Sequence, residues 1–184
     1  MGRLYLKKSC KKLPRIIIVE GFWNLGKTRL INYIGKKYNY YIIPEPNHLT
    51  ENVKKGVSEW YRKKHWERHR LAIKKLKQNK NIIMERSIIS KFAFNYAKSK
   101  KLPADFKESI KRFKKIGIFL IIFLYGEVNF IKKKLSNLEP KDYTVRKQVF
   151  GNLYFYQNYF NFYREILPKF INNRIKFLKI NSKR

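Results

Sequence analysis

Short runs of branched apolar residues recur along the chain, separated by longer stretches in which apolar and polar residues are mixed. The first run, from Arg15 to Glu20, has the sequence RIIIVE and ends at a glycine. A continuous apolar run of this length is typical of a strand that is buried on both faces of a parallel sheet. We predict further strands at residues 40–43, 82–85, 116–125 and 175–180.

The stretches between these runs predict helices, and Ser87 and Asp105 are candidate caps for two of them. Strands that alternate with helices favour an α/β fold, in which a five-stranded parallel sheet is flanked by helices and joined by right-handed crossovers. We expect a basic leader at 1–14 and a single domain at 15–184. Helices are expected at 29–38, about 50–79, 87–99, 103–115, 127–135 and about 144–170, the last interrupted near Pro168, with a polar loop at 136–143.

The chain is strongly basic, because its 184 residues include 44 Lys and Arg against 12 Asp and Glu, a formal net charge of +32. A hydrophobic content of 44%, with 16% aromatic residues, is enough to bury a core and argues against disorder. A positive field of this size attracts polyanions, which include nucleotides, nucleic acid and anionic lipid. Compositional drift toward AT-rich codons, which favours lysine, is the alternative explanation for part of the charge.

The cysteine content and the lengths of the apolar runs indicate the cellular compartment in which the protein is expected. Cys10 is the only cysteine, so an intramolecular disulfide and a multi-cysteine zinc site are excluded and a reducing compartment is expected. No stretch reaches the ~18 to 20 apolar residues that a membrane span requires. We therefore expect a cytoplasmic protein without a membrane partner.

The strongest chemical signal lies between the first predicted strand and the helix that follows it. This segment has the sequence GFWNLGKT and satisfies the phosphate-binding pattern G-x-x-x-x-G-K-[ST]. In such a loop the backbone N–H groups surround the phosphates of ATP, the lysine reaches the outer phosphates and the hydroxyl binds Mg²⁺. The candidate ATP-binding residues are Gly21, Phe22, Trp23, Asn24, Leu25, Gly26, Lys27 and Thr28.

The middle of this loop departs from the usual composition. Phe22 and Trp23 are bulky, and Asn24 stands where many such loops have glycine. Asparagine is the non-glycine residue that tolerates positive φ best, so the loop geometry stays accessible. A chance match is the alternative, and the position between a strand and a helix argues against it.

Around this loop the sequence resembles the thymidylate kinase and deoxynucleoside kinase branch of the P-loop kinases. Three short segments carry the resemblance, each at the end of a predicted strand: the Glu20-Gly21 step into the loop, Pro44-Glu45-Pro46 and Glu85-Arg86-Ser87. The resemblance implies that Glu45 accepts the proton of the acceptor hydroxyl. It also implies that Glu85 supports the metal and that Arg86 contacts phosphate.

General properties of parallel sheets support the same positions. Ligands bind at the carboxyl ends of strands in open parallel sheets, and Glu20, Glu45 and Glu85 all lie at such ends. Phosphate transfer needs a metal that screens charge, an aligned acceptor and a base near the acceptor's proton. Salt bridges to Lys27 and Arg86 are the alternative role for these carboxylates.

The match is weaker in the region expected to form a lid, at about 136–148. Deoxynucleoside kinases have an arginine-rich lid over the donor phosphates, whereas the cations here are Lys141, Arg146 and Lys147. Arg146 is the candidate for stabilising transition-state charge, with a plain surface cation as the alternative. The glutamine that reads the nucleobase in these enzymes has no counterpart that we can place, since Gln78 lies at the far end of its helix.

Aromatic and histidine residues follow the second predicted strand, where related kinases line their acceptor pocket. We take Trp60 and Tyr61 as candidates for binding the acceptor, together with Glu45 and Arg86, and packing in the core is the alternative. The i, i+4 spacing of two histidines would suit zinc, but no cysteine or third ligand is evident. The full group is Trp60, Tyr61, His65, Trp66 and His69.

A second aromatic group, between Phe150 and Tyr163, occupies more than one face of its predicted helix. We interpret it as core plus a homodimer surface, with a stacking platform for single-stranded nucleic acid as the alternative. Lysine clusters are scattered over several elements and are either solvated faces or a nucleic-acid footprint. They lie at 7–12, 63–70, 74–80, 98–101, 111–115 and 132–134.

Three functions are compatible with these features. The first is a Mg-ATP-dependent kinase of a nucleoside or nucleoside monophosphate. The second uses the same catalytic residues on a hydroxyl end of nucleic acid, and the third is a nucleotide-dependent nucleic-acid-binding module with little turnover. The candidate catalytic residues are Lys27, Glu45, Arg86 and Arg146, and the candidate metal ligands are Thr28 and Glu85.

Overall fold

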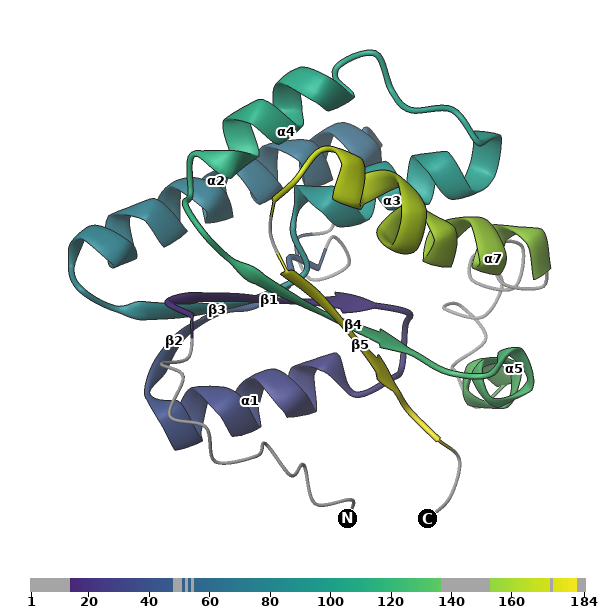
Figure 1. The fold of residues 1–184 in the computed structure, drawn as a ribbon, viewed down its shortest axis with the longest axis horizontal. Helices are drawn as coiled ribbons and strands as arrows, with labels where there is room; N and C mark the ends of the chain where they lie inside the picture. The colour runs from purple at the N-terminus through teal and green to yellow at the C-terminus, as the bar shows by residue number, and fades with distance from the viewer. Residues whose placement is uncertain are drawn as a thin grey trace.

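The computed structural model describes residues 14–47, 51, 53, 55–136, 153–172 and 174–181. Its centre is a sheet of five parallel strands in the order β2-β3-β1-β4-β5 (Figure 1). This confirms the α/β fold that the sequence predicts. The strands are β1 (Ile16–Gly21), β2 (Tyr40–Ile43), β3 (Asn81–Glu85), β4 (Leu120–Tyr125) and β5 (Arg174–Lys179).

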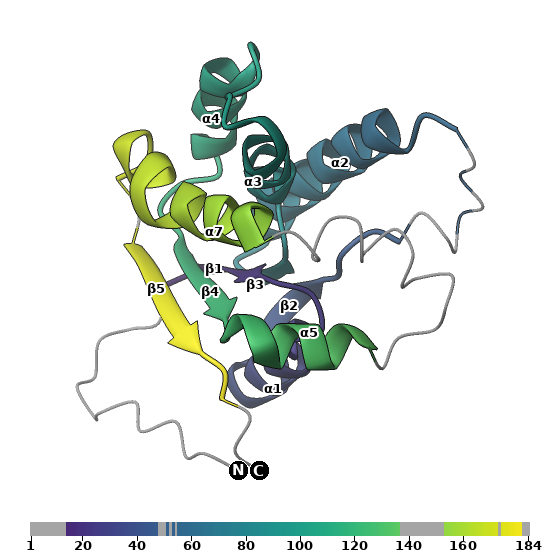
Figure 2. The same cartoon turned by 90° about the vertical axis from the view of Figure 1, so that its right-hand side faces the viewer.

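Helices cover both faces of the sheet. One helix, α1 (Lys27–Tyr38), lies below the sheet in Figures 1 and 2, and α5 (Val128–Ser136) follows the carboxyl end of β4. The opposite face of the sheet carries α2 (Val57–Lys77), α3 (Ile88–Ser99), α4 (Phe106–Lys114) and α7 (Leu153–Asn161).

Within the described residues, no helix is long and apolar enough to cross a membrane.

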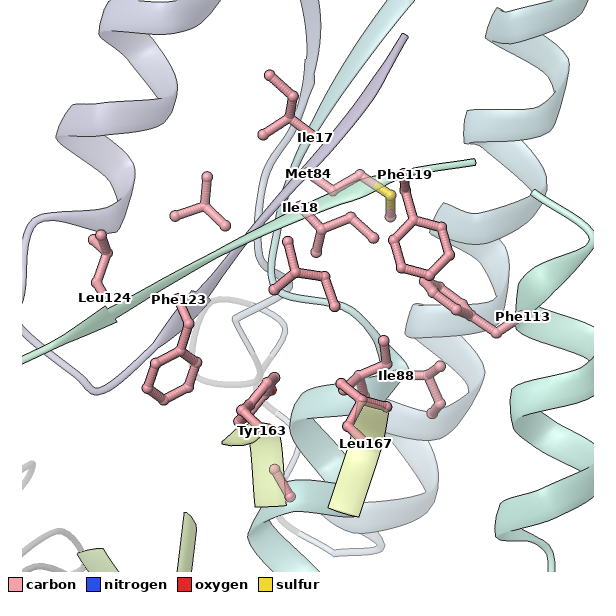
Figure 3. Close-up of a cluster of buried hydrophobic side chains, with 14 of the residues drawn as sticks. Ile17, Ile18, Met84, Ile88, Phe113, Phe119, Phe123, Leu124, Tyr163 and Leu167 are labelled. Carbon is pink, nitrogen blue, oxygen red and sulfur yellow. The ribbon is translucent and has the colours of Figure 1, made fainter. Parts of the chain in front are cut away.

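The apolar run that predicts β1 forms the central strand. Every residue of β1 is buried, because β3 and β4 pair with it on either side and helices cover both faces. Ile17, for example, lies opposite Ile83 on one side and Leu120 on the other. Figure 3 shows part of the core between the sheet and the covering helices, including Ile18, Met84, Phe113, Phe119, Tyr163 and Leu167.

The second aromatic group is largely part of this core, as one part of our interpretation expects. The side chains of Phe155, Tyr159, Phe162 and Tyr163 are buried, whereas Tyr154 remains 71% exposed. The expected long helix is divided: after α7 the chain forms a π-helical turn (Phe162–Ile166) and then a 3-10 turn that contains Pro168 (Leu167–Lys169). The first part of that expected helix, 144–152, lies outside the described residues, as does nearly all of the basic leader.

Three expected starts are wrong: α4 begins at Phe106 rather than at residue 103, and in the other two cases a glycine explains the difference. Strand β4 begins at Leu120 rather than at residue 116, because Gly117 has a φ of +105° and its amide bonds to the carbonyl of Lys114 in a turn. Helix α2 begins at Val57 rather than near residue 50, directly after Gly56 with a φ of +66°. Left-handed backbone of this kind ends regular structure and favours glycine.

The two candidate caps differ. Ser87 caps α3 as expected, since its Oγ accepts a hydrogen bond from the amide of Ile89 at 3.2 Å. Asp105 occupies the residue before α4, but its side chain makes no capping hydrogen bond. The Ser87 cap matters for the site, because it starts α3 directly after the segment that carries Glu85 and Arg86.

Candidate functional site

The glycine-rich loop joins the carboxyl end of β1 to the start of α1. Gly21 has a φ of +125°, and a Cβ atom there would lie 2.1 Å from the carbonyl oxygen of Leu124 on the neighbouring strand, so only glycine fits. Gly26 and Asn24 also adopt left-handed backbone, with φ of +79° and +56°. The asparagine therefore takes the conformation that its sequence position suggests.

Phe22 anchors the loop in the hydrophobic core. Its ring is buried and stacks on Tyr156 of α7, with centroids 4.1 Å apart, and it also packs against Tyr159 and Phe123. Its amide donates to the carbonyl of Leu124 at 3.2 Å. Because that amide is engaged, the backbone of residues 24–28 is the better candidate for contact with phosphate. The bulk of Phe22 is thus explained by packing.

Replacing this anchor is expected to be strongly destabilising. Phe22→Ala removes a buried ring from an aromatic cluster, and the free energy of unfolding should fall by about 3 to 5 kcal/mol. Urea denaturation measures this change. Tyr154→Ala is the control, because that ring is 71% exposed. Equal losses in the two variants would show that the loop is not anchored through Phe22; if Phe22→Ala fails to fold, Phe22→Leu supplies the comparison.

Lys27 begins α1 with its side chain folded back over the loop. Its Nζ donates to the carbonyl of Phe22 at 2.7 Å, and only 6% of the residue is exposed. Burial, together with the charge of nearby Arg86, lowers the pKa of the amine to about 7, although neighbouring carboxylates oppose the shift. A polyphosphate beside this amine would raise its pKa again by adding negative charge.

Thr28 and Glu85 bring two oxygen atoms together beside the loop. The Thr28 hydroxyl donates to Glu85 Oε1 at 2.7 Å, across the boundary between α1 and the end of β3. The parallel register explains this proximity, since Val19 near the end of β1 lies opposite Glu85. A hydroxyl and a carboxylate suit Mg²⁺, which takes few protein ligands and completes its shell with water and phosphate oxygens.

Glu45 and Arg86 form an ion pair at the ends of β2 and β3. Arg86 Nε lies 3.1 Å from Glu45 Oε2, without the alignment of a hydrogen bond. Glu45 therefore does form a salt bridge, which is the alternative role considered for the strand-end carboxylates. Its side chain is nevertheless 31% exposed. Burial disfavours the charged guanidinium, but Glu45 and the other groups around it raise the pKa of Arg86 overall.

Two aromatic residues contact the guanidinium of Arg86. It lies over the ring of Trp23, 4.2 Å from the centroid, and Nη1 donates to the Tyr159 hydroxyl at 3.3 Å. Its Nη2 is buried and has no hydrogen-bond partner among the described residues. Such a donor, in an arginine that is only 3% exposed, is suited to binding an anionic or polar ligand group.

Glu20 lies beneath the site rather than in it. Its carboxylate is fully buried and accepts from the Ser87 amide at 2.9 Å and the Ser87 hydroxyl at 2.8 Å. The hydroxyls of Ser90 and Tyr163 donate to its other oxygen. Burial raises the pKa of Glu20, although these hydrogen bonds oppose the shift. Glu20 therefore differs from the other strand-end glutamates, Glu45 and Glu85, because its hydrogen bonds hold the start of α3 in place.

The aromatic and histidine group after β2 divides into two parts. Trp60 packs edge-on against Tyr61, Tyr61 stacks on His65, and His65 bonds to Arg68 at the strand ends. Trp66 and His69 face α4 instead, where Trp66 contacts Arg112 and His69 bonds to the Phe113 carbonyl. The histidines thus have separate partners, and the described residues contain no group of three metal-ligating side chains.

One buried residue at the site, Arg68, was not singled out from the sequence. Its guanidinium bonds to backbone carbonyls at the ends of β2 and β3. It belongs to the basic stretch 63–70, which in isolation resembles a solvated helix face. Its spacing of three residues from His65 is the only local signal. Arg146 and residues 137–148 of the expected lid lie outside the described residues.

Comparisons with known proteins agree with this architecture. No protein-family model and no curated protein sequence matches the chain. A deoxyadenosine kinase from M. mycoides with bound dATP is 21% identical with a TM-score of 0.54, and covers 90% of each chain. The thymidylate kinase of Candida albicans is 16% identical with a TM-score of 0.56, over 92% of this chain and 84% of that enzyme.

A third similar structure is the YorR protein of Bacillus subtilis in complex with phosphorylated GDP. It is 20% identical with a TM-score of 0.52, over 89% of this chain and 85% of YorR. At these identities the comparisons show the fold alone. The resemblance to P-loop nucleotide kinases is confirmed at that level.

Proposed function

We propose that this protein transfers the γ-phosphoryl group of ATP to a hydroxyl or phosphate of a nucleoside or nucleoside monophosphate. The observation that carries the proposal is the convergence of three neighbouring strand ends. The loop after β1, Glu45 after β2 and Glu85-Arg86 at the end of β3 lie together at the carboxyl edge of the sheet. Ligands bind at this edge in open parallel sheets.

The donor side of the proposed site consists of the loop and two side chains. Backbone amides at the start of α1 would receive the phosphates of ATP, and Lys27 would turn from the Phe22 carbonyl toward them. Thr28 and Glu85, already in contact, would hold Mg²⁺. When bound, the metal neutralises charge that develops on the transferred group.

The acceptor side consists of Glu45 and Arg86. The partly exposed carboxylate of Glu45 would accept the proton of an attacking hydroxyl, as a general base must lie within reach of that proton. The unpaired Nη2 of Arg86 would bind the acceptor or the transferred phosphate. The contact with the Trp23 ring helps to hold this guanidinium in place before any ligand arrives. Trp60, Tyr61 and Arg146 remain candidates for acceptor binding and for the lid.

The similar structures support a nucleotide-kinase reading. Two of them are a deoxyadenosine kinase and a thymidylate kinase, and a third holds phosphorylated GDP. Their acceptors differ, so likeness of fold does not choose between a nucleoside and a monophosphate. A carboxylate beside the unpaired Arg86 donor is compatible with either acceptor.

A transfer assay with labelled ATP tests the proposal. The pure protein is incubated with Mg²⁺, γ-labelled ATP and one acceptor from a panel of nucleosides, nucleoside monophosphates and 5′-hydroxyl oligonucleotides. We expect label to appear on a nucleoside or a monophosphate. Absence of label on every acceptor, with the protein folded, would contradict the proposed kinase activity.

A second candidate acceptor is a hydroxyl end of nucleic acid. The specific observation is a group of exposed cations on α2 and α4, which meet where Arg112 contacts Trp66. The segments Arg70–Lys77 and Lys111–Lys115 contain no acidic residue and have exposed cations, and Arg112 packs over Trp66 between the two helices. A surface of this charge favours phosphate backbones without reading their sequence.

Salt dependence separates this candidate from non-specific attraction. If the protein makes about six phosphate contacts, the logarithm of its association constant for an oligonucleotide should fall linearly with the logarithm of the salt concentration. The slope should be near −0.9 per contact for duplex and near −0.7 per contact for single strands. Lys74→Gln with Lys111→Gln should reduce the magnitude of the slope by about one unit per residue. The matched pair Lys36→Gln with Lys176→Gln, on α1 and β5, should change it less. Equal changes in both pairs would assign the binding to net charge alone.

The outcomes at physiological salt decide among the functions. Retained micromolar binding together with transfer to an oligonucleotide end would favour the nucleic-acid kinase. Retained binding without transfer would favour a nucleotide-dependent binding module. Loss of binding with intact transfer to a small acceptor would leave the charge as compositional drift.

A further inference from the structure

Arg68 places a buried guanidinium behind the proposed acceptor site. It lies on α2, only 8% exposed, and its Nη2 donates to the carbonyls of Ile43 and Arg86, each at 3.2 Å. The carbonyl of Glu85 accepts from the same nitrogen. One terminal nitrogen therefore connects the last residue of β2 to the last residue of β3 and to the turn that follows it.

These carbonyls belong to the backbone that presents the proposed catalytic groups. Ile43 precedes Glu45 by two residues, and the other two carbonyls are those of Glu85 and Arg86 themselves. No hydrogen bond links the Arg68 guanidinium to the loop 21–28 among those that the described residues show. Its contacts are concentrated on the acceptor and metal side.

The turn at Arg86 needs such support. Arg86 has a φ of +57°, a left-handed conformation that a residue with a side chain adopts at a steric cost. Its amide bonds to the Val19 carbonyl at 2.9 Å, and the next amide, that of Ser87, bonds to Glu20. Arg68 donates hydrogen bonds to the carbonyls of Glu85 and Arg86 in the same turn. The unusual backbone persists because surrounding groups hold it from both sides.

His65 fixes the orientation of this guanidinium. Its Nδ1 lies 3.0 Å from Nη1 of Arg68, and because arginine only donates, Nδ1 must accept and the ring must be neutral. Burial lowers the pKa of His65 well below its usual value, and the charges of Arg68, Arg86 and Lys91 lower it further. Burial lowers the pKa of Arg68, and the charges of Glu45, Glu20 and Glu85 oppose that shift. The imidazole therefore stays an acceptor at neutral pH.

We infer that Arg68 is a positioning residue for phosphate transfer, which holds Glu45 at the end of β2 in register with Glu85 and Arg86 at the end of β3, and that neutral His65 orients it. The inference rests on the proposed function, because it assigns roles to the same site. It does not make Arg68 a ligand of either substrate. The guanidinium acts through three backbone carbonyls.

The first test compares two buried residues of the same helix. Arg68→Met removes the bonds to the strand ends, and kcat is expected to fall roughly 10²-fold, the scale of an ångström-sized misplacement. KM for ATP should change by less than about threefold, because the loop 21–28 is not contacted. His69→Leu is the matched control, since His69 is also buried but bonds to Phe113 on α4. It should lower stability without lowering kcat.

Conservative variants separate positioning from bulk stability. Arg68→Lys keeps the charge but lacks the planar fork, so it should recover little of the lost kcat. His65→Asn keeps an acceptor oxygen near the position of Nδ1 and should stay within about threefold of wild type. His65→Leu lacks that acceptor and should lose about tenfold. Equal kcat losses in His65→Asn and His65→Leu would contradict the orienting role of His65.

Hydrogen exchange tests the inference without relying on activity. In Arg68→Met, or in Arg68→Lys if the first variant does not fold, amides in peptides covering 43–47 and 85–88 should exchange faster than in wild type. Amides of α1 should be unaffected. If wild-type protein transfers no phosphate, the proposed function fails, and the exchange result still decides the role of Arg68. Unchanged exchange at 85–88, or a kcat loss matched by His69→Leu, would overturn the inference.

Discussion

Lys27→Ala is expected to abolish phosphate transfer and to leave the fold intact. The amine touches the loop carbonyl of Phe22 rather than the apolar core, and its pKa of about 7 reflects unfavourable burial of charge. Its removal should therefore not destabilise the protein, whereas a phosphate chain would lose its nearest cation. The loss of a donor of this kind reduces kcat by about 10²- to 10³-fold or more.

Steady-state kinetics with the pure variant measures this effect, and urea denaturation checks the fold. The control is Lys36→Ala, which removes an exposed lysine from the last turn of the same helix. Turnover of Lys27→Ala at the wild-type level would show that the loop does not act on a nucleotide phosphate. A matched loss in Lys36→Ala would assign the effect to α1 as a whole.

Glu45→Gln is expected to lower kcat by roughly 10²-fold or more while both substrates still bind. Glutamine has nearly the same shape but does not accept the acceptor's proton, and general base catalysis contributes on this scale. Arg86 also loses the countercharge 3.1 Å from its Nε, so some loss of stability should accompany the change. The comparison is Glu59→Gln, which removes an exposed carboxylate that pairs with Arg62 on α2.

The division of the effect between kcat and KM identifies the role of Glu45. A fall confined to kcat indicates the proposed base. If only KM for the acceptor changed, Glu45 would be a binding residue and the base would have to be a different group. Kinetics at several acceptor concentrations distinguish these results.

The features of the fold that sequence predicts are those with local signals. Branched apolar runs located all five strands, and the G-x-x-x-x-G-K-[ST] pattern located the turn between β1 and α1. Parallel strands then bring their carboxyl ends together by geometry alone. This is why the proximity of Thr28 to Glu85, and of Glu45 to Arg86, follows from short motifs far apart in the chain.

The features that sequence reasoning missed depend on contacts between distant segments. Arg68 belongs to a run of cations, and only the packing of α2 against the strand ends shows that it is buried. Phe22 is unusually bulky for a phosphate loop, and the structure explains it, because its ring stacks on Tyr156 of α7. Glu20 seemed equivalent to the other strand-end carboxylates, but Tyr163 and the serines of α3 enclose it.

The most direct measurement follows two labels of ATP in the same reaction. With a nucleoside or monophosphate acceptor, γ-labelled ATP should place its label on the acceptor, and α-labelled ATP should yield labelled ADP only when that acceptor is present. The Lys27→Ala variant should neither label the acceptor nor produce labelled ADP. Label from γ-labelled ATP found only as inorganic phosphate, at a rate independent of every acceptor, would contradict the account, because the site would then hydrolyse ATP rather than transfer its phosphate.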